Sequence, residues 1–188
     1  MSETTIDTAP AAPVDRLTPI LFAVAIFTSA SLVFLIQPMA TKLILPMLGG
    51  SPAVWNTAMV FFQAALLAGY AYAHLLQRVA SIRAQVGAHL ALLAAAALFL
   101  PLQVSGLLGD PDPAAPIPWL LATLALSVGP PFAVLSPTAP LLQAWYARVR
   151  AGHADGRNPY VLYAPSNLGS FLALLSYPAL VEPLGTLS

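Results

Sequence analysis

The side chains that could carry chemistry in this sequence are few, and most of them interrupt long apolar stretches. Lys42 stands out, because no other charged residue lies between Arg16 and Arg78. A cation at the centre of a bilayer costs about 2.5–3.5 kcal/mol, so such a residue often marks a site. Lys42 could bind an anionic lipid or substrate from the outer side of a membrane, or its aliphatic stem could carry the charge to the headgroups.

Amide side chains also lie within apolar stretches. They can hydrogen-bond to neighbouring helices, and each such bond stabilises the bundle by about 0.6 kcal/mol on average in a bilayer. Alternatively, they can line a polar pathway if several converge in space. We therefore predict polar contacts with lipid or substrate at Lys42 and at four amides: Gln37, Asn56, Gln63 and Asn167.

The sequence has no arrangement typical of catalysis, cofactor binding or metal binding. Neither His74 nor His89 has a second histidine or a carboxylate at ligand spacing, whereas a zinc site needs three or four ligands. Asp110 and Asp112 lie between prolines and are expected to be solvated, without the buried partner that acid–base catalysis needs. We predict no catalytic, cofactor or metal site, and the lack of a basic run predicts no nucleic-acid partner.

The composition indicates whether water or lipid surrounds these residues. Hydrophobic residues make up 59% of the chain and charged residues only 7%, whereas soluble proteins carry about 25% charged residues. Five uncharged blocks separate the charges, at residues 17–41, 43–77, 84–109, 113–147 and 158–181. Each exceeds the roughly 20 residues that a helix needs to cross a bilayer. We therefore predict an all-α, multi-pass transmembrane helical bundle.

The predicted spans are residues 18–36, 53–77, 84–100, 119–134 with a helical continuation at 138–148, and 160–180. Residues 1–16 are expected to form a disordered cytoplasmic tail, and residues 17–188 the membrane domain. Gln37 and Pro38 are expected to end the first span, and Ser51 to cap the second. The fourth block contains the run Gly129-Pro130-Pro131, which favours either two helical pieces or one kinked helix.

Charge asymmetry predicts the orientation. With a cytoplasmic N-terminus, every arginine falls on the inner side and Lys42 alone falls outside, as the positive-inside tendency favours. On the second span, Ala65, Gly69 and Ala73 recur every four residues, and small residues at this period allow helices to pack closely.

Three segments resemble one family of bacterial membrane proteins. They are SLVFLIQPMATKLILPMLGGSPAVWNTAMVFFQAALLAGYAYAHLL at residues 31–76, PFAVLSPTAPLLQAWYA at 131–147 and NPYVLYAPSNLGSFLALLSYPALVEPL at 158–184. In order, they resemble the N-terminal membrane domain of multi-pass spermidine-synthase-like proteins, some of which are labelled fused transporter/spermidine synthase. The resemblance implies a bacterial inner-membrane location and a longer parent protein. It carries no catalytic residue over, because these residues contain no Gly-rich nucleotide-binding segment.

Three roles therefore stay open. The chain could be the membrane domain of an aminopropyltransferase-like (polyamine-forming) enzyme, with the lipid bilayer and the missing C-terminal domain as partners. It could instead be a transporter or permease for a small solute. It could also be a structural subunit that packs against another membrane protein.

Overall fold

The computed structural model describes residues 16–100, 106–111, 114–153, 156, 158–181 and 183, and within them every regular element is helical. The predicted tail, residues 1–16, lies outside this part except for Arg16, and Arg157 also lies outside it. The helices are α1 Leu17–Ile44, α2 Pro52–Leu76, α3 Ile82–Ala96, α4 Pro116–Ser127, α5 Gly129–Leu135, α6 Thr138–Val149 and α7 Tyr163–Ser176. Short 3₁₀ turns extend several of them, and a π-helical turn at Tyr177–Val181 follows α7.

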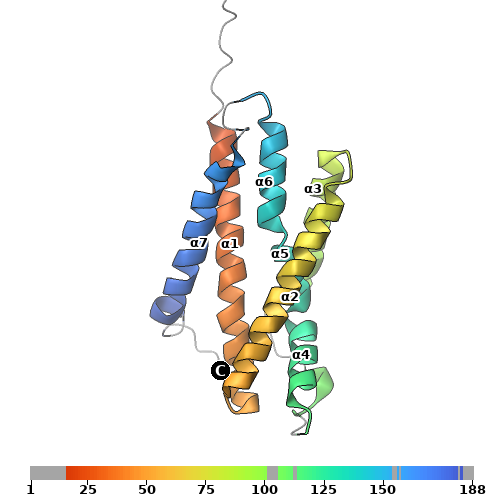
Figure 1. Cartoon of the computed structure of the whole chain (residues 1–188), viewed down its shortest axis with the longest axis vertical. Helices are drawn as coiled ribbons and strands as arrows, with labels where there is room; N and C mark the ends of the chain where they lie inside the picture. Colours follow the sequence, from red (N-terminus) through yellow and green to blue (C-terminus); the bar gives the residue numbers. More distant parts are fainter. Residues whose placement is uncertain are drawn as a thin grey trace, which may run out of the picture.

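The helices form an elongated bundle in which the chain direction alternates (Figure 1). α1 runs from the upper to the lower end in this view, α2 returns, and α4, α5 and α6 rise in succession toward the upper end. α7 then descends beside α1, so the first and last helices are parallel neighbours. The Arg148 guanidinium donates to the carbonyl of Gln77 over 3.1 Å, which joins the ends of α6 and α2.

Three segments are long and apolar enough to cross a membrane: Leu17–Leu48, Pro52–Leu76 and Ile82–Phe99. A fourth is formed if α4 and the Gly129–Val149 segment are taken as one span, although they meet at a bend of 63°. α7 has 14 residues, or about 21 Å at 1.5 Å per residue. Alone it is shorter than the hydrocarbon core of a bilayer, which is about 30 Å thick. The described part of the chain is therefore all-helical and contains three to four helices long and apolar enough to span a membrane, and the fifth span stays a prediction.

The first helix is longer than its sequence suggests. α1 continues through Pro38 to Ile44 instead of ending at residue 36. In an apolar solvent a broken helix would leave its backbone groups without water, so a helix tolerates an internal proline. The carbonyl that loses its usual amide donor at Pro38 is that of Phe34, four residues earlier, whereas the hydroxyl of Thr41 donates to the carbonyl of Gln37 at 2.8 Å within the same helix.

The turn after α1 has the geometry that its glycines permit. Gly49 and Gly50 have φ angles of 75° and 62°, in the left-handed region that glycine adopts without strain. Ser51 Oγ then accepts the amide proton of Val54 at 3.4 Å, and Pro52 occupies the start of α2. The predicted cap is therefore confirmed.

The fourth block divides into three pieces. Within the predicted span 119–134, α4 ends at Ser127 and φ at Val128 is −120°, so the helix breaks earlier than the junction expected between residues 134 and 138. Pro130 and Pro131 lack amide protons, so they fit the first turn of a new helix better than the middle of an old one. α4 also begins at Pro116, three residues before the predicted start of the span at residue 119.

Two of the contact regions that hold the described helices together involve α1. A core of α1, α2, α4 and α5 is centred on Phe62 and Phe132, whose rings meet edge to face with centroids 5.0 Å apart. α1 and α7 pack closely at Gly169, whose carbonyl lies 3.1 Å from Ser31 Oγ and shares that hydroxyl proton with the carbonyl of Phe27, at 2.9 Å. A Cβ atom on Gly169 would lie 2.5 Å from the carbonyl oxygen of Phe27, so only glycine permits this approach.

Candidate functional site

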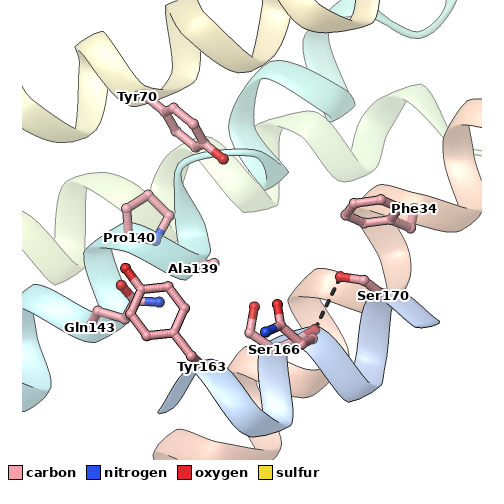
Figure 2. Close-up of a pocket in the computed structure, with 9 residues that line it drawn as sticks. Phe34, Tyr70, Ala139, Pro140, Gln143, Tyr163, Ser166 and Ser170 are labelled. Carbon is pink, nitrogen blue, oxygen red and sulfur yellow. Dashed lines mark hydrogen bonds between the residues drawn. The ribbon is translucent and has the colours of Figure 1, made fainter. Parts of the chain in front are cut away.

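A polar cavity of about 490 Å³ lies between α1, α2, α6 and α7. Its volume falls within the range of roughly 300–1,000 Å³ that is usual for small-molecule sites. Figure 2 shows Tyr70 of α2, Pro140 and Gln143 of α6, and Ser166 and Ser170 of α7 around a common space. The remaining lining residues are Phe34, Ala139, Tyr163 and Asn167.

The face of α7 that lines the cavity is set by helical spacing. Ser166, Asn167 and Ser170 lie within one turn of each other, so they project from the same side. The Ser170 hydroxyl donates to the carbonyl of Ser166 at 3.0 Å, so its oxygen keeps its capacity to accept a further hydrogen bond (Figure 2). α6 begins directly after Pro137, and its residues Ala139, Pro140 and Gln143 line the same cavity.

A smaller cavity of about 120 Å³ adjoins the first and shares Phe34, Tyr70, Ala139, Ser166 and Ser170 with it. It reaches the middle of α1 at Ser29, a residue only 6% exposed. Ser29 Oγ is buried and has no hydrogen-bond partner. A buried hydroxyl without a partner loses the hydrogen bonds that it would make in water. The adjoining cavity therefore contains a polar atom that a bound molecule would satisfy.

None of the side chains that line the two cavities carries a charge at neutral pH. The lining consists of hydroxyls, two amides, three aromatic rings and aliphatic groups. Such a site can exchange hydrogen bonds and cover apolar faces, but it offers no counter-ion.

The predicted site residues are distributed unevenly. Asn167 lines the cavity, whereas Gln37, Lys42, Asn56 and Gln63 line neither this cavity nor its neighbour. Lys42 and Gln37 are half-buried near the end of α1. Asn56 and Gln63 are exposed and seven residues apart on α2, so they lie on one outer face. The amides and Lys42 therefore do not converge.

The small residues of α2 lie on the side of the helix that faces the bundle. A Cβ atom on Gly69 would overlap Ser136 Oγ and lie 3.0 Å from Pro137 Cδ. Ala73 is buried in a cluster with Leu141 and Trp145 of α6, and Ala65 packs against the larger core. This face therefore joins α2 to the junction of α5 and α6 within the same chain.

A second polar cluster was missed in the sequence, where its members are far apart. Trp145 Nε1 donates to Gln85 Oε1 at 2.7 Å, and Gln85 Nε2 donates to the carbonyl of Val79 at 2.5 Å. His89 Nε2 lies 3.0 Å from Thr138 Oγ1. Gln85 and His89 are four residues apart on α3 and fully buried. That spacing of two polar residues on an apolar helix was the available signal.

This second cluster joins α3 to α6 and lacks the composition of a metal centre. Within the part of the chain that the structure describes, no three His, Asp or Glu side chains lie close enough together to hold a metal ion. The polar cavity is therefore the stronger candidate for ligand binding.

Comparison with known proteins adds no further identification: no family model, curated protein or solved structure matches the chain.

Proposed function

We propose that this chain is a membrane-embedded binding domain of five spans, with a cytoplasmic N-terminus, and that it belongs to a longer spermidine-synthase-like protein of the bacterial inner membrane. The observation that carries the binding role is the cavity between α1, α2, α6 and α7, which gathers uncharged polar side chains from α2, α6 and α7. The hydroxyl and amide groups that line it can exchange hydrogen bonds with a bound molecule.

The ends of the bundle support the proposed orientation. Arg16 begins α1, Arg78 and Arg83 flank the turn between α2 and α3, and Arg148 and Arg150 lie at the end of α6. The start of α1, the turn between α2 and α3 and the end of α6 lie toward the same end of the bundle in Figure 1, and Arg148 contacts Gln77 there. The positive-inside tendency assigns such an end to the cytoplasm.

The family assignment rests on the three resembling segments, which include most of the cavity. The second segment, 131–147, contributes Ala139, Pro140 and Gln143, and the third, 158–184, contributes the face of α7. In this proposal the enzyme domain follows further spans downstream, and the domain described here supplies its anchor and a membrane-side binding site.

Cysteine labelling tests the topology, because the chain contains no natural cysteine. Ala80→Cys, in the turn after α2, and Asp110→Cys, in the segment before α4, are both exposed. In intact cells a membrane-impermeant maleimide should label Asp110→Cys and should reach Ala80→Cys only after permeabilisation. Labelling of Ala80→Cys in intact cells would contradict the orientation.

A second pair of variants tests the cavity. Ser170→Cys lies in the cavity wall, whereas Phe171→Cys is exposed on the outer face of α7 and does not line it. In membranes a small water-soluble thiol reagent should modify Ser170→Cys and leave Phe171→Cys unmodified, because a thiol in lipid does not form the reactive thiolate. If Ser170→Cys is inert, the cavity is not accessible from water and the binding role fails.

Transport is the second candidate, and the bent fourth segment favours it. The 63° bend between α4 and the following helices leads into α6, whose first turns line the cavity. Interrupted helices beside a central site are a feature of secondary transporters. Uptake of a polar solute by vesicles that Asn167→Leu abolishes and Asn56→Leu preserves would favour transport; no uptake would favour binding alone.

A further inference from the structure

We propose that the cavity selects an uncharged ligand rich in hydroxyl groups, such as a sugar or polyol. This inference rests on the proposed binding role of the same site. The geometry points to it in three ways: the lining has no charge, it mixes donors with acceptors, and aromatic rings flank the polar groups.

The uncharged lining disfavours ions. A cation or anion that enters the cavity loses hydration, and no side chain of the opposite charge lines either cavity to compensate it. An uncharged polar molecule loses only hydrogen bonds to water, and the cavity can replace those directly.

The hydrogen-bonding inventory favours hydroxyls over groups of a single kind. Gln143 and Asn167 each present an N–H₂ donor and a carbonyl acceptor, and the hydroxyls of Tyr70, Tyr163 and Ser166 can act in either role. An ammonium group only donates and a phosphate or carboxylate only accepts, so either would leave one end of each amide unmatched. A hydroxyl donates one bond and accepts others, and therefore matches it.

Aromatic rings provide the apolar counterpart. Phe34, Tyr70 and Tyr163 line the cavity, and the ring of Tyr163 stacks on Tyr160 with centroids 5.4 Å apart, which restrains its orientation. Sugars and cyclic polyols combine C–H faces with a rim of hydroxyls, so one molecule can use both kinds of wall. In the adjoining cavity the buried Ser29 Oγ, which has no partner, offers a further contact at the deeper end.

A hydroxyl-rich group could be a free solute or the headgroup of a glycolipid, and protection of Ser170→Cys from a small thiol reagent separates the two. The whole chain is reconstituted in nanodiscs of phosphatidylcholine and titrated with glucose, myo-inositol, choline or glutamate. It is also reconstituted in nanodiscs that contain a glucosyl diacylglycerol. At ten times its dissociation constant, a protecting ligand should slow labelling about tenfold.

The expected result is protection by a neutral polyol in phosphatidylcholine discs, which identifies a free solute, or by the glucosyl lipid alone, which identifies a headgroup. Choline and glutamate should not protect. With Gln143→Glu added to Ser170→Cys, choline should gain protection and the polyol or glucosyl lipid should lose it, because a carboxylate then faces the cavity. This reversal also shows that the variant is folded.

Two results overturn the inference while the proposed binding role stands. One is a reactive Ser170→Cys that no hydroxylated probe protects; the other is protection by choline or glutamate equal to that by the polyol. An unreactive Ser170→Cys is a different outcome, because it overturns the water-accessible cavity and the inference together.

Discussion

Gly169→Ala should loosen the contact between the first and last helices. The added Cβ would lie 2.5 Å from the carbonyl oxygen of Phe27 and 3.0 Å from Ser31 Oγ. Separations below 3.0 Å essentially never occur for real Cβ atoms. The nearest obstacle is backbone and cannot rotate away, so α1 and α7 must move apart by roughly 0.5 Å or more, in a tightly packed interior.

The expected loss follows from that movement. Inserting a methyl group into a packed interface costs about 1–3 kcal/mol. Separation also stretches the 3.1 Å bond from the Ser31 hydroxyl to the carbonyl of Gly169, and such bonds contribute about 0.6 kcal/mol on average in a bilayer. Alanine favours the helix over glycine by up to about 1 kcal/mol, which offsets part of the loss.

Gly87→Ala is the matched control, because this helical glycine of α3 has nothing within 4 Å of an added Cβ. It gains the same helix propensity without the clash. Reversible unfolding in mixed detergent micelles with dodecyl sulfate, followed through the 3 tryptophans, measures both free energies. We expect Gly169→Ala to be less stable than Gly87→Ala by at least about 1 kcal/mol. Equal stabilities would refute the close packing of α1 and α7.

Three further substitutions test other contacts. Gly69→Ala should destabilise the protein less than Gly169→Ala does, because the added Cβ clashes mainly with the rotatable Ser136 hydroxyl. Adding Ser136→Ala should restore part of the lost unfolding free energy, and no recovery would refute that cause. Gln85→Leu leaves the Trp145 N–H without its acceptor and should cost about 1–3 kcal/mol. Combined with Trp145→Phe it should cost less than the sum of the single variants; strict additivity would exclude coupling. Ser51→Ala should lose about 1 kcal/mol and Ser51→Asp should not; equal stabilities in the same titration would rule out the cap.

The sequence was informative about where helices lie because the blocks between charges are long and apolar. It was less informative about their ends. Pro38 suggested a stop, since proline costs about 3 kcal/mol inside a helix, yet α1 continues to Ile44. In an apolar solvent, leaving backbone groups without partners costs more. At Val128 the opposite occurs, because two consecutive prolines and a glycine follow.

Of the residues that line the cavity, only Asn167 was predicted from the sequence as a site residue. Its other polar residues come from three helices: Tyr70, Gln143, Tyr163, Ser166 and Ser170. Whether they share a space depends on how each helix is rotated, and contacts such as that of Gly69 with Ser136 fix the rotation. Apolar periodicity carries little information about rotation in a helix surrounded by lipid. Hence neither the convergence nor the burial of Ser29 could be read from the sequence.

The pairing of α1 with α7 has a consequence for biosynthesis. Ser31 and the Gly169 carbonyl that it contacts are 138 residues apart in the chain. At a translation rate of about 5–20 residues per second, α1 enters the membrane on the order of ten seconds before its main neighbour is made. During that interval the groove around Phe27 and Ser31 must be covered by lipid or by the insertion machinery. A ribosome that stalls before residue 163 would leave this face without its native neighbour, and such a stalled product should be a preferred substrate for membrane proteases.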